Sequence, residues 1–151
     1  RGFASGSRLF FYGDGVLRYS DDGGASCTTV TKGITAGAYA GAGDGKNVVA
    51  QTGAGQLQVA YSKDNGTTWS VKKAPVVGGG PHAMVAADGC FVMSNKLHML
   101  RSCDGGSTWS AIDTGAPKVS LFISNPPRAL AASGGYVYGF FGTQLYRHPS
   151  K

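Results

Sequence analysis

Apolar residues occur along the chain in short runs that end at glycine, aspartate or serine. Examples are the segments RLFFYG, KNVVAQ, CFVMS and YVYGFF. Such runs are too short for helices of ordinary length, and the apolar positions show no helical period. Valine, isoleucine, tyrosine and phenylalanine between Gly- and Asp-rich clusters are typical of strands joined by tight turns. The pattern therefore predicts an all-β domain.

One polar pattern returns three times between these runs. It reads YSDDGGASCT at residues 19–28, YSKDNGTTWS at 61–70 and RSCDGGSTWS at 101–110. Each copy carries serine, aspartate and glycine at alternate positions: Ser20, Asp22 and Gly24; Ser62, Asp64 and Gly66; Ser102, Asp104 and Gly106. The copies follow one another at intervals of 42 and 40 residues, which is the length of a four-stranded repeat unit.

The chemistry of the repeated pattern is that of a tight turn. An aspartate in a turn accepts hydrogen bonds from backbone N–H groups that follow it, and a glycine two positions later takes positive φ without steric cost. The residue that follows is aimed back at the sheet, so we expect Trp69 and Trp109 to anchor their turns by burying a large ring. Cys27 occupies the tryptophan position of the first copy, where we expect it to pack as a small apolar side chain.

The segments SKDNGTTW and SCDGGSTW resemble Asp boxes, also called BNR repeats, of sialidase-like and sortilin-like β-propellers, and SDDGGASC resembles a degenerate copy. In those families the box lies between the third and fourth strands of a blade, away from the central pocket. The resemblance therefore implies a β-propeller in which Asp22, Asp64 and Asp104 are turn formers and not catalysts.

This placement of the boxes divides residues 1–151 into about four blades of one propeller domain, approximately 1–32, 33–75, 76–116 and 117–151. Second strands are expected near 8–12, 46–50, 90–93 and 136–140, and third strands near 16–19, 57–61, 97–101 and 144–147. The first blade would hold at most a stub of its first strand, at 1–4, and the fourth would lack its last strand, with Ser150 and Lys151 opening a further box. These incomplete blades predict a fragment of a larger propeller, or a ring that another chain closes.

Composition and charge narrow the possible functions. The chain has 151 residues, 42% apolar residues and 25 glycines, as expected for one turn-rich domain. No apolar run approaches the roughly 20 residues of a membrane helix, so membrane insertion is not expected. The net charge is +6, but the 14 basic residues do not cluster, which argues against a nucleic-acid partner. Cys90 and Cys103 flank an expected hairpin and either face each other as a disulfide or are parted by a one-step change of register.

Catalytic and metal-binding chemistry finds little support. Glycoside hydrolysis usually needs two facing carboxylates, and the chain has no glutamate and eight aspartates. Three aspartates belong to the boxes, Asp21 lies inside the first box, and Asp14, Asp44 and Asp88 precede glycine in hairpin signals. Asp113 is expected in another turn. The three histidines match no common zinc spacing, so no metal and no cofactor is expected.

The C-terminal segment YVYGFFGTQLYRH is denser in aromatic residues than one blade requires. Candidate ligand-binding residues there are Tyr136, Tyr138, Tyr146, Arg147 and His148. The sequence thus predicts a non-catalytic binding or scaffold module that recognises a glycan or a protein surface. Two alternatives stay open: a fragment of a sialidase-like hydrolase whose catalytic residues lie elsewhere, and a structural subunit that self-associates or is completed by other chains. The family resemblance implies an extracellular or virion-associated setting.

Overall fold

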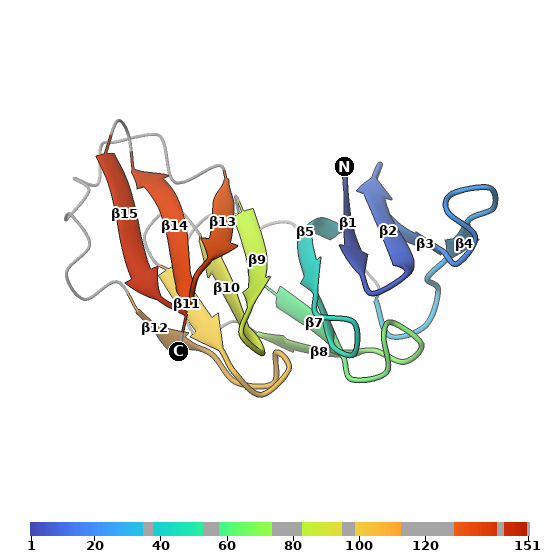
Figure 1. The fold of residues 1–151 in the computed structure, drawn as a ribbon. Coiled ribbons are helices and arrows are strands. Elements are labelled where there is room, and N and C mark those ends of the chain that lie inside the picture. Colours follow the sequence, from blue (N-terminus) through green and yellow to red (C-terminus); the bar gives the residue numbers. More distant parts are fainter. Residues whose placement is uncertain are drawn as a thin grey trace.

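A computed structural model describes residues 1–34, 38–52, 58–73, 83–94, 99–112, 129–141 and 144–150 of the chain. All regular structure in these ranges is β, arranged as four antiparallel sheets that follow one another in sequence order (Figure 1). The prediction of an all-β fold is confirmed. None of the described segments forms a helix long and apolar enough to cross a membrane.

The first two sheets each have four strands. The first sheet consists of β1 (Gly2–Ser5), β2 (Arg8–Gly13), β3 (Val16–Ser20) and β4 (Thr28–Thr29). The second sheet consists of β5 (Ala38–Gly43), β6 (Val48–Thr52), β7 (Gln58–Ser62) and β8 (Ser70–Lys73).

The third sheet has four strands and the fourth has three among the described residues. The third sheet consists of β9 (Ala83–Ala87), β10 (Cys90–Ser94), β11 (Met99–Ser102) and β12 (Ser110–Ala111). The fourth sheet consists of β13 (Leu130–Ser133), β14 (Tyr136–Phe141) and β15 (Gln144–Pro149).

Two strand positions differ from those expected. β1 is a complete partner of β2, paired through all four of its residues, and not a stub. The second strand of the second sheet begins at Val48, two residues later than expected, because the carboxylate of Asp44 accepts bonds from the N–H groups of Lys46 and Asn47 and holds them in a turn. The expected strand starts at Leu57 and Leu97 lie outside the described residues. The expected blade boundaries stay a prediction.

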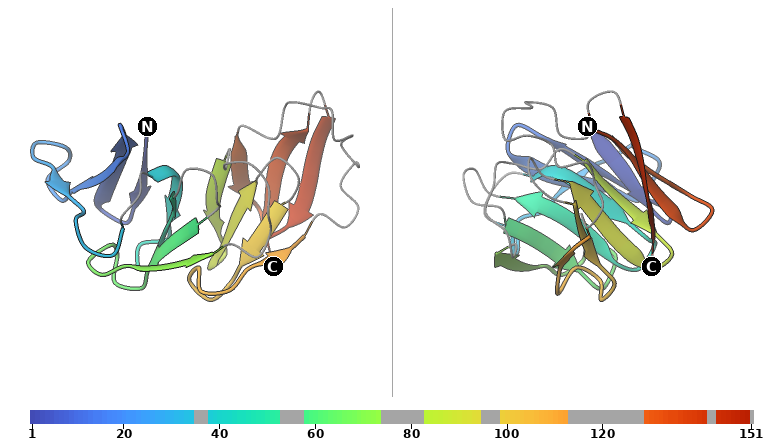
Figure 2. Two further views of the ribbon diagram at one scale, coloured as in Figure 1. Left: turned by 180° about the vertical axis from the view of Figure 1, so that it is seen from behind. Right: turned by 90° about the vertical axis from the view of Figure 1, so that its left-hand side faces the viewer.

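The first strand of each sheet lies beside the first strand of the next sheet, so that β1 contacts β5, β5 contacts β9 and β9 contacts β13. We call these four the inner strands. Figure 2 shows that the sheets stand side by side and are rotated relative to one another. An apolar core fills each space between neighbouring sheets, centred on Phe10 and Ala50 between the first and second, on Val49 and Phe91 between the second and third, and on Val92 and Val137 between the third and fourth. This is the arrangement of consecutive propeller blades.

Candidate functional site

The repeated pattern forms three turns of the same construction, which we call the aspartate turns: residues 20–27, 62–69 and 102–109. In each, the serine hydroxyl donates a hydrogen bond of 2.7 to 2.9 Å to the aspartate carboxylate. The same serine oxygen accepts a bond of 2.7 to 2.9 Å from the N–H of the glycine. The carboxylate also accepts two hydrogen bonds from the residue four positions after it, one from its N–H and one from its hydroxyl. This residue is Ser26, Thr68 or Thr108.

These bonds keep the carboxylates ionised. The hydroxyl and N–H of Ser26, with the hydroxyl of Ser20, hold the pKa of Asp22 well below its ordinary value. Partial burial raises the pKa of Asp64, but the bonds from Thr68 and Ser62 outweigh it and lower the pKa to about 2. Burial likewise raises the pKa of Asp104, and the bonds from Thr108 and Ser102 lower it to about 2. The aspartates are therefore fixed hydrogen-bond acceptors within their turns.

The second aspartate turn is packed against the sheet that precedes it. A β-carbon added to Gly66 would lie 2.6 Å from the ring of Phe10 in the first sheet. Trp69 meets the same ring edge-on, with centroids 6.3 Å apart, and its indole N–H donates to the carbonyl of Gly66 at 3.0 Å. The tryptophan thus joins its own turn to the neighbouring core.

The third aspartate turn repeats this contact one sheet further along. A β-carbon added to Gly106 would lie 2.7 Å from a methyl of Val49 and 2.8 Å from the β-carbon of Tyr61, both in the second sheet. The indole N–H of Trp109 donates to the carbonyl of Gly106 at 3.0 Å, and the ring packs against the same core.

The first aspartate turn has no such contact. All of its residues after Ser20 are exposed, and nothing lies within 4 Å of a β-carbon added to Gly24. The expectation that Cys27 packs as a small apolar side chain is wrong, since Cys27 is an exposed free thiol. The physical reason is that no sheet precedes the first within the described residues, so none of these residues offers a surface on which the turn packs.

The candidate ligand residues of the C-terminal segment lie on two opposite faces of the fourth sheet. Tyr146 packs against the core shared with the third sheet, and the ring of His148 lies 6.4 Å from it. Tyr136, Tyr138 and Arg147 lie on the other face, since Val137 between the two tyrosines is buried in the core. The rings of Tyr136 and Tyr138 are 6.4 Å apart, and the guanidinium of Arg147 lies 4.5 Å from the centroid of Tyr136. The five residues therefore do not form one site, and their role in ligand binding stays a prediction.

A cavity of about 440 Å³ opens beside the inner strands. Each of the four inner strands contributes to its lining, together with β2 and the residues that directly precede β1 and β13. The lining residues are Arg1, Gly2, Phe3, Tyr12, Ala40, Gly41, Ala83, Met84, Ala129 and Leu130. The sequence pattern did not reveal this cavity, because its walls come from five segments that are distant in sequence, and half of the lining residues are glycine or alanine.

The described aspartates are engaged in turns or bonds elsewhere. The carboxylate of Asp21 forms a salt bridge with the guanidinium of Arg8 at 2.6 Å, and the carboxylate of Asp44 accepts a hydrogen bond from the side-chain amide of Asn47 at 2.9 Å. Asp14 and Asp88 stand at positive φ ahead of glycine, in the hairpins β2–β3 and β9–β10. Asp113 lies outside the described residues. In the described part of the chain, no group of three or more histidine, cysteine or acidic side chains is placed to hold a metal ion.

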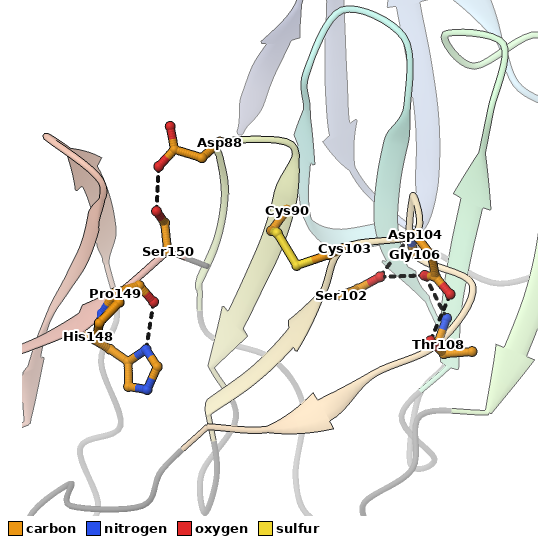
Figure 3. The surroundings of a disulfide bond; sticks show 10 residues. All are labelled: Asp88, Cys90, Ser102, Cys103, Asp104, Gly106, Thr108, His148, Pro149 and Ser150. Carbon is orange, nitrogen blue, oxygen red and sulfur yellow. Dashed lines mark hydrogen bonds between the residues drawn. A yellow bond between two sulfur atoms is a disulfide. The ribbon is translucent and has the colours of Figure 1, made fainter.

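Figure 3 shows two further contacts, one within the third sheet and one between the third and fourth sheets. Cys90 and Cys103 form a disulfide across the hairpin β10–β11, which decides the alternative that the sequence left open. Ser150 is buried as Ser20, Ser62 and Ser102 are. Its hydroxyl donates to the carboxylate of Asp88 in the third sheet.

Comparison with known proteins supports the fold. No known family model matches the sequence, and no curated protein matches it significantly. Among solved structures, the GH74 xyloglucanase from Xanthomonas campestris aligns with a TM-score of 0.74 and 16% identity over 97% of this chain and 28% of that chain. YCF48 bound to a D1 peptide aligns with a TM-score of 0.67 and 17% identity, over 99% and 52%. A GH74 enzyme from Niastella koreensis aligns with a TM-score of 0.65 and 22% identity, over 96% and 23%.

These neighbours are β-propeller proteins, and the fold of this chain is that of a β-propeller segment. The chain spans about half the length of YCF48 and about a quarter of the length of the GH74 enzymes.

Proposed function

We propose that the chain is a non-catalytic β-propeller binding module that holds a segment of a partner protein beside its inner strands. The observation that carries this proposal is the lining of the cavity, in which Arg1 lies with Phe3, Tyr12, Met84 and Leu130 and the described lining residues include no carboxylate side chain. A lining that mixes a charged residue, aromatic rings and aliphatic side chains suits the binding of a peptide, whereas hydrolysis of a glycoside needs a pair of acids.

The backbone of the inner strands supports a peptide as the ligand. Each inner strand is the edge of its sheet, so one row of its N–H and C=O groups has no partner within the sheet. An extended peptide binds such edges through main-chain hydrogen bonds. The bound D1 peptide in the structurally similar YCF48 supports the same ligand class.

A peptide array and a glycan array, probed with the folded chain, test the proposal. Ala129 is exposed at the cavity, so Ala129→Trp fills the cavity without disturbing the core and is expected to weaken peptide binding at least about tenfold. Leu145→Ala, a change at an exposed residue that does not line the cavity, is the matched control and leaves binding unchanged. Binding to glycans alone, or equal binding by both variants, contradicts the proposal.

A second candidate is a fragment of a glycoside hydrolase. It is favoured by the likeness to the GH74 xyloglucanase, whose TM-score of 0.74 exceeds that of YCF48. In that case the catalytic acids lie outside the described residues. The complete protein would then hydrolyse a fluorogenic sialoside or a xyloglucan oligosaccharide, and a lack of turnover on both removes this candidate.

We also propose that the three aspartate turns are Asp boxes of the sialidase-like class. This assignment is supported by the shared hydrogen bonds of the three aspartate turns. The disulfide between Cys90 and Cys103 supports an extracellular or virion-associated setting, because disulfides persist in oxidising compartments. Thiol labelling of the protein from its native source tests the setting: Cys90 and Cys103 should react only after reduction.

A further inference from the structure

One side-chain amide is buried without a hydrogen-bond partner close to the cavity. Gln51 lies on β6, an interior strand of the second sheet, and is fully buried. Neither its Nε2 nor its Oε1 has a hydrogen-bond partner among the described residues. Asn65, which also has a buried atom without a partner there, still donates from its Nδ2 to the carbonyl of Ser5. Because burial of a polar group without a bond costs free energy, the amide of Gln51 is suited to bind a ligand.

Strand pairing places this amide beside the cavity. Gln51 pairs with Ala40 on one side and with Val59 on the other, so the three side chains share one face of the sheet. Val59 belongs to the core between the second and third sheets, so Gln51 points toward the third sheet. Ala40 lines the cavity, and so does Met84, which packs against the same core. Gln51 therefore lies directly behind the cavity wall, next to Ala40 and on the side that Met84 covers.

The repeat gives the same position in the first sheet to a residue that lines the cavity. Leu9 and Val48 are the residues that pair with the serines of the first and second aspartate turns. Three residues after them stand Tyr12 and Gln51, so Gln51 has in the second sheet the place that Tyr12 has in the first. Tyr12 is part of the cavity lining. The fold therefore directs this position toward the cavity, and in the second sheet the group there is an amide.

We propose that Gln51 is a main-chain anchor for the bound peptide, uncovered when the side chain of Met84 rotates away from it. This inference rests on the proposed function and assigns a further binding residue to the same site. Met84 is partly buried at the cavity, and methionine is unbranched with three rotatable bonds, so it adapts its shape readily. Ala40, the other neighbour of Gln51 at the wall, extends no further than a methyl group.

The chemistry of a carboxamide matches an extended peptide backbone. Nε2 is a donor and Oε1 is an acceptor, and an extended residue presents its own N–H and C=O on the same side. Nε2 of Gln51 donates to the carbonyl of one peptide residue, and Oε1 accepts from the N–H of that residue. Because the amide is uncharged and contacts only the main chain, it selects an extended backbone and not a particular side chain.

Gln51→Met tests the anchor, because it removes both polar atoms at nearly constant size. In the free chain the variant is expected to raise the denaturant midpoint of unfolding, since a buried amide without a partner is lost. The peptide of the array that binds wild type most tightly, acetylated and amidated at its ends, is the probe. Its dissociation constant is expected to rise at least about tenfold in the variant. Stability and affinity then change in opposite directions, which a loss of packing does not produce.

Thr52→Val is the matched control, because it removes a buried polar group from the opposite face of the same strand. Thr52 is buried and pairs with Ala38, which belongs to the core toward the first sheet. Thr52 is not among the described lining residues of the cavity. The control is expected to bind the peptide as wild type does.

Peptides methylated at one backbone nitrogen at a time locate the contact. At the position that meets Gln51, methylation removes the N–H that Oε1 accepts, so it weakens binding to wild type much more than binding to Gln51→Met. If wild type binds the peptide and Gln51→Met binds it equally well, or no position shows this coupling, the anchor is overturned and the proposed function stands. If wild type binds no peptide on the array, the proposed function fails and the anchor fails with it.

Discussion

The first and second aspartate turns have the same internal bonds but different surroundings. In both, the serine hydroxyl reaches the aspartate at 2.7 Å, and the aspartate accepts a hydroxyl at 2.6 Å from the residue four positions later. The first turn nevertheless stands in solvent with Cys27 exposed, whereas the second packs on Phe10 through Gly66 and Trp69.

The comparison separates two kinds of interaction that stabilise an aspartate turn: hydrogen bonds within the turn and packing on the preceding sheet. The bonds from serine to aspartate and glycine are local, spanning two to four residues, so the turn forms whether or not a sheet precedes it. Packing on the preceding sheet is a tertiary interaction that requires glycine at the contact and a large ring beside it. Variants that act on only one kind of interaction measure each of them.

The largest difference is expected between Gly66→Ala and Gly24→Ala. Both glycines have positive φ, 86° and 99°, so each alanine adds backbone strain of about 1–2 kcal/mol. At Gly66 the new methyl also enters the ring of Phe10, which is fully buried and cannot move aside. Overpacking adds about 1–3 kcal/mol there, so the total loss is about 2–5 kcal/mol.

Chemical denaturation of the two variants measures these losses of unfolding free energy. Gly106→Ala is the matched repeat, because its methyl would meet Val49 and Tyr61, and it should resemble Gly66→Ala. Equal losses at Gly24 and Gly66 would show that backbone strain alone decides the outcome and that packing on the preceding sheet contributes little.

The disulfide distinguishes the third turn from the other two, since Cys103 is its second residue. The bond joins residues 13 apart in sequence, and closing a loop of that size stabilises the folded state by about 3 kcal/mol in the chain-entropy account. Cys103→Ser is expected to lose about this amount. Wild type in reducing agent should match the variant, while Cys27→Ser, which removes only the free thiol, should unfold as wild type does.

The local parts of this molecule were predictable from the sequence, and the tertiary parts were not. The aspartate turns were readable because all their bonding groups lie within eight consecutive residues. The exposure of Cys27 was not, because it depends on whether a sheet precedes the turn. The disulfide depended on register: Phe91 pairs with Ser102, which places Cys90 opposite Cys103, and a shift by one residue would part them. The cavity required four inner strands to meet, which no local pattern encodes.

Exchanging the residues at the anchor position sharpens the comparison further. Trp69→Cys gives the second turn the residue of the first and removes the edge-to-face contact with Phe10. Because Trp69 is only half-buried, the expected loss of unfolding free energy is about 2–3 kcal/mol, less than for a fully buried tryptophan. Cys27→Trp is expected to change the stability of the 151-residue chain by less than about 0.5 kcal/mol, since none of the described residues offers a surface on which the ring could pack. A stabilisation by Cys27→Trp that grows with protein concentration would instead indicate packing between copies.

The smallest expected effect is the pH dependence of the turns. The pKa of Asp64 in the folded chain is about 2, below its ordinary value, so its hydrogen bonds stabilise the protein above pH of about 4. This stabilisation is lost as the pH falls toward 2, because the carboxyl must then be protonated. Asp64→Asn is expected to lower the unfolding free energy at neutral pH by about 1 kcal/mol, since a carboxylate near solvent is screened, and to flatten the decline between pH about 4 and about 2. Thermal unfolding across this range, with Asp113→Asn as the control outside the aspartate turns, measures the effect. A decline as steep in Asp64→Asn as in wild type would mean that acid acts elsewhere in the chain, and the local bonds shared by the first and second turns would then contribute little to stability.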